Sequence, residues 1–353
     1  MAATTATQAP PGAARPAATG RSRVPVRAAG LLAALLLLGL AVLLSIAVGS
    51  RSIPPGTVIH ELLHYDGSDD GVVIRDLRVP RTALGLAVGA SLGLAGTLMQ
   101  SLTRNPLADP GLLGVNAGAS AAVVAAISVL GLGSSAVDVW FALAGAAVAA
   151  VLVYLLGSRG RAAATPVRMA LAGATVSAVL GALVSAMVLS DPEAFDDYRF
   201  WSVGALAGRP IQVLWQTGGF MLAGAVLALA LARPLNALAL GDDAGRALGA
   251  RRGRTHVLTI LAITLLCGAA TAAAGPIGFV GLAVPHLARW FTGPDLRWVL
   301  PYSMVLAPVM LLLADVVGRV IAPPGEIEAG IVTAFVGAPF FVLLARRRKL
   351  VQL

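Results

Sequence analysis

The sequence predicts an all-α polytopic membrane protein with about ten transmembrane helices, and three observations support this fold class. The 353 residues are 58% hydrophobic and 12% charged, with a mean hydropathy of +0.84, whereas about a quarter of the residues in soluble domains are charged. Apolar runs of about 20 residues, the length that crosses a bilayer, recur along the whole chain. Neither an internal repeat nor a long polar linker divides them. We therefore expect one domain, residues 28–346, embedded in lipid.

The chain begins with a tail, residues 1–27, whose Ala, Pro, Thr and Arg content is typical of disorder. The next run, 28–48, has features of a signal peptide. It is long for one and many spans follow, so we assign it as the first helix. Nine more spans are expected, at 82–102, 112–132, 137–156, 167–189, 213–232, 257–274, 277–291, 299–321 and 330–345. The run 277–291 is short and rich in Gly and Pro, which leaves the count open by one. Residues 347–353 form a second tail.

The distribution of basic residues predicts the orientation of these spans. With the N-terminus in the cytoplasm, 19 of the 26 Lys and Arg residues fall on the cytoplasmic side and seven on the other. Short cytoplasmic loops of membrane proteins carry this excess of positive charge. We therefore expect both tails, and the polar segment 236–254, in the cytoplasm.

Composition also excludes several functions. The net charge of +9 comes from short loops between spans, and aromatic residues are only 5%, so surfaces that stack nucleic-acid bases are not expected. Cys267 is the only cysteine and lies in an apolar run, which argues against a disulfide framework or a Cys-rich metal site. Lys349 is the only lysine, so a phosphate-binding loop ending in Gly-Lys-Ser/Thr cannot form. If ATP is used, another chain must bind it.

The polar segment 236–254 has the pattern of a short helix between two spans. Asp242 follows Gly241 and can cap that helix, and Gly249 can end it in a left-handed conformation. Apolar residues remain on a loop that should be solvated: Leu238, Leu240, Ala244 and Leu248. The segment is either an ordinary connector or a docking surface, and its own residues do not decide between them.

A second irregular stretch, residues 104–118, separates two apolar runs on the cytoplasmic side. Pro106 and Pro110 cannot continue a helix, and Asp109 can hold a turn or cap the next helix. From the residues alone this is a tight turn between helices.

Five stretches follow one another in an order and spacing found together in a known family. They are Arg78-Val-Pro-Arg81, Asn105-Pro-Leu-Ala-Asp-Pro-Gly-Leu-Leu-Gly114, Leu238-Ala-Leu-Gly241, Gly275-Pro-Ile-Gly-Phe-Val-Gly-Leu-Ala-Val-Pro-His-Leu-Ala-Arg289 and Gly330-Ile-Val-Thr-Ala-Phe-Val-Gly-Ala-Pro-Phe-Phe341. Over about residues 54–346 the chain thus resembles the FecCD family, the permease subunits of ABC importers for iron–siderophores, haem and vitamin B12.

The resemblance implies a type II importer in which two ten-helix permeases form a central path. The implied partners are a cytoplasmic ABC ATPase dimer, which binds ATP and Mg, a second permease that is an identical or a related chain, and an extracytoplasmic substrate-binding protein. Residues 28–346 would form the permease domain, and residues 236–252 would contain the coupling helices that contact the ATPase. The coupling residues carried over are Leu238, Leu240, Gly241, Asp242, Asp243, Ala244, Leu248 and Gly249.

Two further sites are implied by the resemblance. Asn105 and Leu107, with the turn at Thr165 and Pro166, would border a cytoplasmic gate. Arginines at the opposite side would face acidic residues of the binding protein: Arg78, Arg81 and Arg319. Charges at an exposed rim steer docking, although these arginines could instead lie at helix ends near lipid headgroups. Asp315 precedes Arg319 by four residues and could hold it within one helix.

The chain departs from the family pattern before its last span. The family usually has Glu-Leu/Ile-Pro-Val-Gly there, whereas this chain has Glu326-Ile-Glu-Ala-Gly330. Glu328 stands in the place of proline, so we expect a looser turn and treat contacts carried over to Glu326 as open.

Two other classes of function were considered. His60-Glu61-Leu62-Leu63-His64 fits the His-Glu-x-x-His pattern of zinc peptidases, with Asp66, Asp69, Asp70 or Asp109 as a third ligand. It lies in an outer loop, however, and Val58, Ile59, Leu62 and Leu63 favour a short amphipathic helix on the membrane surface. A transporter driven by an ion gradient would carry ionisable groups in mid-membrane, whereas the expected spans are nearly free of charge. His286 is expected to be a packed residue.

We therefore expect a multi-pass cell-membrane permease subunit that moves a ferric siderophore into the cytoplasm, with ATP hydrolysed by partner subunits. Haem or cobalamin remains the alternative substrate. Neither a catalytic residue, a metal ion nor a bound cofactor is expected on this chain.

Overall fold

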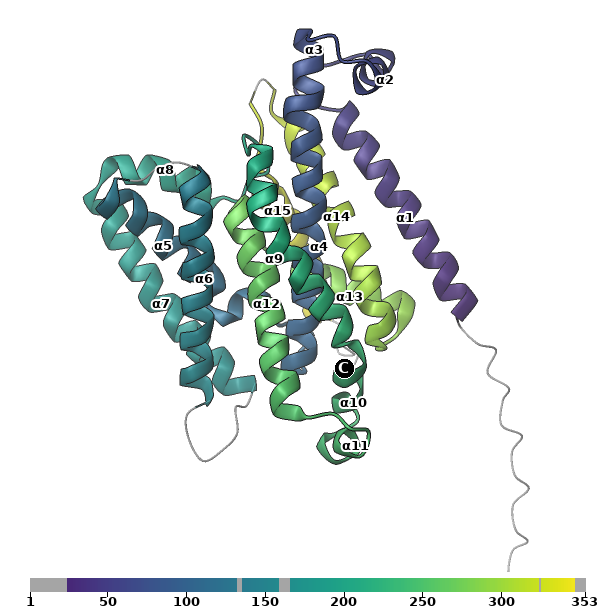
Figure 1. Cartoon of the computed structure of the whole chain (residues 1–353), viewed down its shortest axis with the longest axis vertical. Coiled ribbons are helices and arrows are strands. Elements are labelled where there is room, and N and C mark those ends of the chain that lie inside the picture. Colours follow the sequence, from purple (N-terminus) through teal and green to yellow (C-terminus); the bar gives the residue numbers. More distant parts are fainter. Residues whose placement is uncertain (1–23, 132–134, 159–165, 324, 347–353) are drawn as a thin grey trace, which may run out of the picture.

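The computed structural model describes residues 24–131, 135–158, 166–323 and 325–346, and their regular structure is helical throughout (Figure 1). The helices are α1 (Val24–Ala47), α2 (Pro55–Leu63), α3 (Asp69–Val72), the π-helical η1 (Val73–Arg78), α4 (Val79–Thr103), the 3-10 helix η2 (Pro110–Leu113), α5 (Val115–Leu130), α6 (Ser135–Ser158), α7 (Pro166–Ser190), α8 (Pro192–Ser202), α9 (Ile211–Ala230), α10 (Ala232–Ala239), α11 (Asp242–Ala247), α12 (Arg252–Ala274), α13 (Val280–Thr292), α14 (Leu296–Ile321) and α15 (Ala329–Arg346). The expected tails 1–27 and 347–353 lie wholly or almost wholly outside the described residues.

Each of the ten expected spans coincides with a helix: α1, α4, α5, α6, α7, α9, α12, α13, α14 and α15. Seven of the described helical segments are long and apolar enough to cross a membrane, while α5 and α15 contain shorter apolar stretches. The helix α13 has 13 residues, about two thirds of the length that a straight crossing needs. The fold class is therefore confirmed as an all-helical multi-pass membrane protein.

The second expected span begins earlier than the apolar pattern indicates. The segments α3, η1 and α4 form one continuous helical stretch from Asp69 to Thr103, 35 residues long, whereas the sequence predicts 82–102. Its first turns carry charged residues and project beyond the apolar part. The π-helical turns of η1 precede Pro80, whose ring nitrogen cannot donate to the carbonyl group of the preceding turn.

The helix α4 lies at the centre of the molecule and is the most buried of the candidate spans. Its glycines Gly85, Gly89 and Gly93 face α14, and a Cβ atom at Gly89 would lie 2.6 Å from Pro308 Cα. From the sequence this stripe could line a path or hold helices together. The structure assigns it to close packing of α4 on α14, as small residues permit in membrane helices.

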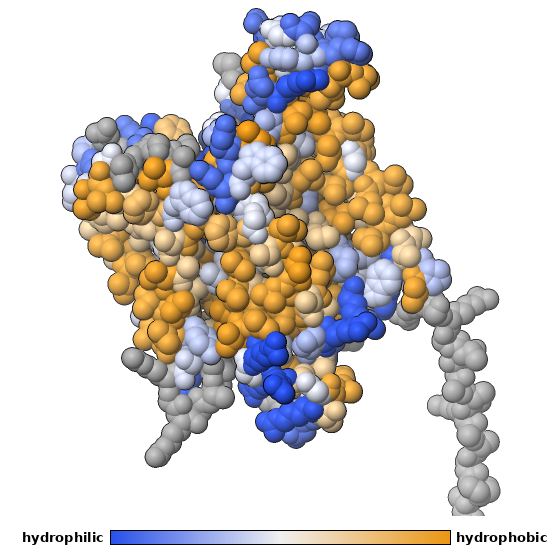
Figure 2. Space-filling view, in the orientation of Figure 1, coloured by the Kyte–Doolittle hydropathy of each residue, from blue (hydrophilic) through white to orange (hydrophobic). Residues whose placement is uncertain are grey.

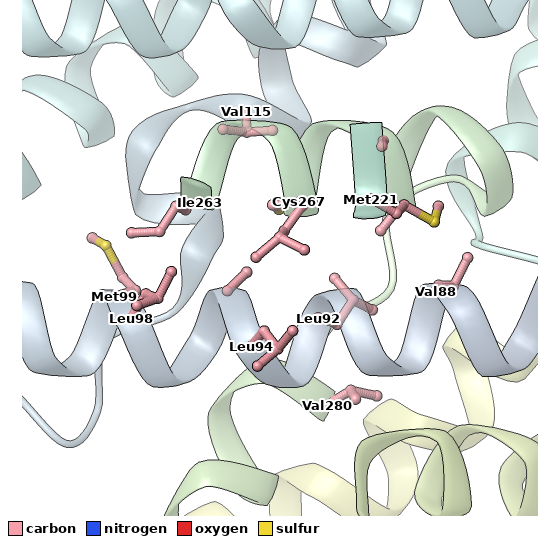
Figure 3. Close-up of a cluster of buried hydrophobic side chains, with 14 of the residues drawn as sticks. Val88, Leu92, Leu94, Leu98, Met99, Val115, Met221, Ile263, Cys267 and Val280 are labelled. Carbon is pink, nitrogen blue, oxygen red and sulfur yellow. The ribbon is translucent and has the colours of Figure 1, made fainter. Parts of the chain in front are cut away.

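Figure 3 shows part of the core around α4, where aliphatic and sulfur-containing side chains of α4, α5, α9, α12 and α13 lie together. Buried side chains of α4, among them Leu94, Leu98 and Met99, meet Ile263 and Cys267 of α12. Residues of α5, α9 and α13 belong to the same cluster, as do buried residues of α6, α14 and other helices. Cys267 is a buried free thiol packed within this cluster.

A partly buried irregular segment, residues 275–279, joins α12 to the short helix α13. The amide of Ala205 donates to the Ala274 carbonyl oxygen at 2.8 Å, and Phe279 adopts a positive φ of 66°. Irregular backbone at membrane depth is tolerated where protein buries it. The run 277–291 is short and rich in Gly and Pro because its first residues belong to this irregular segment and α13 begins only at Val280.

On the face shown in Figure 2, apolar side chains form a band across the middle of the molecule and polar side chains gather at both ends. At one end the Tyr302 hydroxyl of α14 donates to the Arg27 carbonyl oxygen of α1 at 2.6 Å. The same end carries α10 and α11, and the opposite end carries α2, α3 and the turn between α14 and α15 (Figure 1). We call these the α11 end and the α2 end.

Candidate functional site

The helices α10 and α11 protrude from the α11 end (Figure 1), and this protrusion exposes two leucines. Leu240 is 69% exposed and Leu248 is 65% exposed, and Asp243 and Ala244 are exposed as well. Leu238 points the other way and is buried. Its carbonyl oxygen accepts from Arg104 Nη2 at 2.8 Å. Six of the eight expected coupling residues are exposed or half-buried on this protrusion: Leu240, Gly241, Asp243, Ala244, Leu248 and Gly249.

The boundaries of α11 follow from its glycines. Gly249 has a φ of +82°, its amide donates to the Arg246 carbonyl oxygen, and that of Ala250 donates to the Gly245 carbonyl oxygen, both at 2.9 Å. This is a Schellman ending, so the role expected for Gly249 is confirmed. The capping role expected for Asp242 is wrong. Gly241, with a φ of +107°, occupies the N-cap position and Asp242 is the first helical residue.

The protrusion is fixed to the bundle through Asn236 of α10. The Asn236 Nδ2 atom donates to Asp295 Oδ1 at 2.6 Å, and the Leu296 amide donates to Asn236 Oδ1 at 3.0 Å. Hydrogen bonds from Arg297, then from Asn236, lower the pKa of Asp295. Asp295 also caps α14 by accepting from the Arg297 amide. A movement of α10 would therefore be transmitted directly to the start of α14.

The expected gate residues Asn105 and Leu107 lie in the turn between α4 and η2 at the α11 end. Asn105 Oδ1 accepts from the Leu107 amide at 2.9 Å, and Asp109 Oδ1 accepts from the Gly111 amide at 2.8 Å. The turn expected at Asp109 is thus confirmed, and burial raises the pKa of its carboxyl group. Thr165 lies outside the described residues and Pro166 begins α7, so the gate stays a prediction.

The three arginines expected at a docking rim form one internal network at the α2 end. Arg81 Nη2 lies 2.7 Å from Asp315 Oδ1 and Arg81 Nη1 lies 2.6 Å from Glu326 Oε2. Arg319 pairs with the same Asp315, which confirms the pair expected within α14. The Asp315 side chain is fully buried. One carboxylate therefore neutralises two guanidinium groups.

Two of these arginines also hold the end of α1. Arg78 Nη1 donates to the Ala47 carbonyl oxygen at 2.8 Å, and Arg319 Nη1 donates to that of Ser45 at 2.7 Å. Arg78 is 5% exposed and Arg319 is 2% exposed, so both are buried rather than displayed at a rim. Direct contact with a docked protein would require their release. Arg81 is the more accessible of the three, with its side chain 13% exposed.

A cavity of about 600 Å³ opens beside this network. Its charged lining consists of five arginines and two acidic residues: Arg51, Arg78, Arg81, Arg209, Arg319, Asp76 and Glu326. Clefts lined by one sign of charge concentrate groups of the opposite sign. The α2 end therefore offers a positively charged hollow of the size of a small-ligand pocket.

The turn before α15 is closed by backbone and side-chain contacts despite its departure from the family pattern. The Ile327 amide donates to the Gly318 carbonyl oxygen at 3.0 Å, and the Ile331 amide donates to that of Glu328 at 3.0 Å. Glu326 keeps its contact with Arg81. Glu328 accepts the hydrogen bond from the Ile331 amide at the start of α15 through its carbonyl oxygen, and a turn looser than the proline-containing one stays a prediction.

The match to the model of the FecCD transport family extends over residues 35–347, which includes nearly the whole helical bundle. The chain belongs to the FecCD transport family.

Individual relatives are similar over almost the same range. The FecCD-family chain is 47% identical over 314 residues to the ferric enterobactin transport system permease protein FepD of Escherichia coli (strain K12), covering 89% of this chain and 94% of that protein. It is 40% identical over 304 residues to the Fe(3+)-citrate import system permease protein YfmD of Bacillus subtilis (strain 168), covering 86% and 90%. A solved structure described as a metal-chelate type ABC transporter in an inward-facing conformation matches with a TM-score of 0.79 and 28% identity, covering 91% of this chain and 99% of that chain.

As a FecCD-family chain the protein is a transport subunit, and the ATPase of an ABC importer is a separate chain. The zinc peptidase alternative is therefore wrong. The expected amphipathic helix is present as α2, and ligand atoms of His60, Glu61 and Asp66 lie within 4.8 Å of one another. The second histidine of the pattern, His64, is not in that group, whereas a zinc peptidase binds its metal through both histidines.

The sequence did not reveal the residues that anchor the protrusion. Asn236 and Asp295 are 59 positions apart and neither lies in a motif that specifies the other. The only local signal was the position of Asp295 directly before the apolar run that forms α14, because an acidic residue in that place is typical of a helix N-cap.

Proposed function

We propose that this chain is the permease subunit of an ABC importer that moves a ferric siderophore into the cytoplasm. The observation that carries the proposal is the 47% identity, over nearly the full length of both chains, to a ferric enterobactin permease. The relative YfmD is named for ferric citrate import. Because both relatives are named for iron chelates, a ferric siderophore is favoured over haem or cobalamin as the substrate. The positively charged cavity at the α2 end suits chelates that carry negative charge.

The ten bundle helices cross the cell membrane, and the α11 end faces the cytoplasm. The asymmetry of Lys and Arg supports this orientation, because the α11 end carries most of them. Both chain termini are then cytoplasmic: α1 starts and α15 ends on that side.

The protrusion docks on a cytoplasmic ABC ATPase dimer, which binds ATP and Mg. Exposed leucines on a small helix fixed to the bundle favour this role, since apolar side chains anchor protein interfaces at their buried centre. A push on α11 reaches α14 through Asn236 and Asp295. The carried-over gate residues Asn105, Leu107, Thr165 and Pro166 lie on the same cytoplasmic side.

The α2 end receives an extracytoplasmic substrate-binding protein. Acidic groups on that protein would complement the excess of arginine in the cavity, and such complementarity mainly raises association rates and fixes orientation. A second permease, identical or related, completes the central path. Apolar side chains that the bundle leaves exposed face this second chain or the lipid.

Co-expression with the ATPase tests the proposal. The chain is purified in detergent with a tag, and the amount of ATPase retained is measured for wild type, Leu240→Asp and Leu248→Asp. Leu63→Asp is the matched control, because Leu63 is 70% exposed on α2 at the opposite end. We expect the ATPase to co-purify with wild type and the control and to be lost from the two α11-end variants. Equal retention by all four proteins would contradict the proposed docking surface.

A further inference from the structure

A buried guanidinium group in α13 lacks an acidic partner. Arg289 is 2% exposed, and its Nη1 atom donates to Gln100 Oε1. Its Nε and Nη2 atoms are buried without a hydrogen-bond partner among the described residues. Gln100 is itself fully buried, and its Nε2 atom donates to the Leu282 carbonyl oxygen at 3.1 Å. A neutral amide therefore provides the one acceptor for a full positive charge.

The nearby carboxylate is already engaged elsewhere. Asp295 accepts hydrogen bonds from the Asn236 side chain and from the Arg297 side chain and amide. No ion pair joins Arg289 to a carboxylate within the part of the chain that the structure describes. A buried cation without a counter-charge is costly, and proteins normally pair such groups.

The space beside Arg289 has the size and lining of a small-anion site. A cavity of about 50 Å³ lies between α4, α10 and α13, and its polar lining is Arg289, Arg104, Ser101 and Asn236. Carboxylates are absent from this lining. About 10–15 Å³ of such space holds one water molecule, so the cavity admits a monatomic ion or a few waters. A nucleotide, a siderophore or a lipid headgroup is too large.

We propose that this cavity binds a small monovalent anion, with chloride as the physiological example, between the guanidinium groups of Arg289 and Arg104. The cationic side chains of Arg289 and Arg104 and the polar groups of Ser101 and Asn236 line the site, and the ion supplies the counter-charge that buried Arg289 lacks. Arg104 also contacts the Leu238 carbonyl oxygen, and Asn236 belongs to α10. The anion would therefore help to hold the protrusion against the bundle.

The experiment uses the purified full chain and varies chloride against gluconate at constant ionic strength, with thermal unfolding as the readout. A ligand that binds only the folded state raises the melting temperature in a saturable way. We expect a rise of several degrees with chloride or bromide in wild type and its loss in Arg289→Gln. Arg297→Gln is the control, because Arg297 is an exposed arginine and should leave the rise intact.

A second measurement decides the matter if Arg289→Gln does not fold. Crystals of the wild-type chain grown in bromide should show an anomalous scattering peak beside Arg289. A cavity filled by water alone would give no peak and no chloride-specific shift at constant ionic strength. That pair of results, or a shift that persists unchanged in Arg289→Gln, would overturn the proposal.

Discussion

The two ends of the molecule differ in which side chains they bury and which they expose. At the α2 end, Arg78 and Arg319 look like part of a docking rim in the sequence but are buried, and Asp315 pairs with both Arg81 and Arg319. At the α11 end, leucines that would normally be buried are exposed on α11 and its flanks, and two hydrogen bonds of Asn236 fix the protrusion. The α2 end is thus stabilised from within, whereas the α11 end leaves apolar side chains exposed, and we propose that the ATPase covers them.

The largest effect should follow from neutralising the shared carboxylate. Asp315→Asn leaves Arg81 with Glu326 alone and leaves buried Arg319 without a counter-charge, which costs about 3–5 kcal/mol of folding free energy. We expect a strongly lowered melting temperature or loss of folded protein in detergent. Asp70→Asn, which breaks the more exposed pair with Arg51, should change little. Similar melting temperatures for the two variants would contradict the internal role of the network.

A smaller effect is expected at the anchor of the protrusion. Asn236→Ala removes the amide that donates to Asp295 and accepts from the Leu296 amide. Buried groups left without a hydrogen-bond partner cost about 1–3 kcal/mol of folding free energy. The loosened α10 should also reduce transport-stimulated ATPase activity in the assembled importer. Thr175→Ala is the control, since the Thr175 hydroxyl bonds only within its own helix α7. If stimulation is unchanged in Asn236→Ala, motion is not transmitted through this contact.

The end of α11 should respond more weakly. Gly249→Ala forces a side chain into the left-handed region at a cost of about 1 kcal/mol, which frays the helix that displays Leu248. We expect weaker retention of the ATPase in the co-purification assay. Gly253→Ala lies in α12 with open space around it and should retain the ATPase fully. Equal retention would show that the Schellman ending of α11 is dispensable.

The smallest effect should come from the surface ion pair on α11. Asp243→Asn removes a pair with Arg246 that has an N···O distance of 3.8 Å and a fully exposed carboxylate. Such pairs contribute little to stability because water and salt screen them. We expect an unchanged melting temperature. A clear decrease would mean that the protrusion depends on charge as the α2 end does, and the contrast between the ends would weaken.

Sequence reasoning recovered the features that are local. The apolar runs located all ten bundle helices, and Gly249 marked the end of α11 because a single residue type favours the left-handed backbone there. The glycines of α4 indicated close helix packing, although the sequence could not say that α14 is the partner.

The sequence missed what depends on contacts between distant segments. The amide of Gln100 and the guanidinium of Arg289 are 189 positions apart, and no periodicity relates them. Arg78 looked exposed because it lies near a helix end. The structure buries it because the carbonyl oxygens at the end of α1 need donors, a requirement that appears only once α1 is packed against η1 and α4. The early start of the second span was missed because its polar first turns continue the helix beyond the apolar run.

Uptake by a reconstituted importer tests whether this chain carries a ferric siderophore in an ATP-dependent way. The chain is assembled with its ATPase and second permease in proteoliposomes, supplied with the binding protein and a radiolabelled ferric siderophore, and accumulation is measured with and without ATP on the ATPase side. The account predicts ATP-dependent accumulation with wild type and with Leu63→Asp, and none with Leu240→Asp. Accumulation that does not require ATP, or that Leu240→Asp supports as well as wild type, would contradict it.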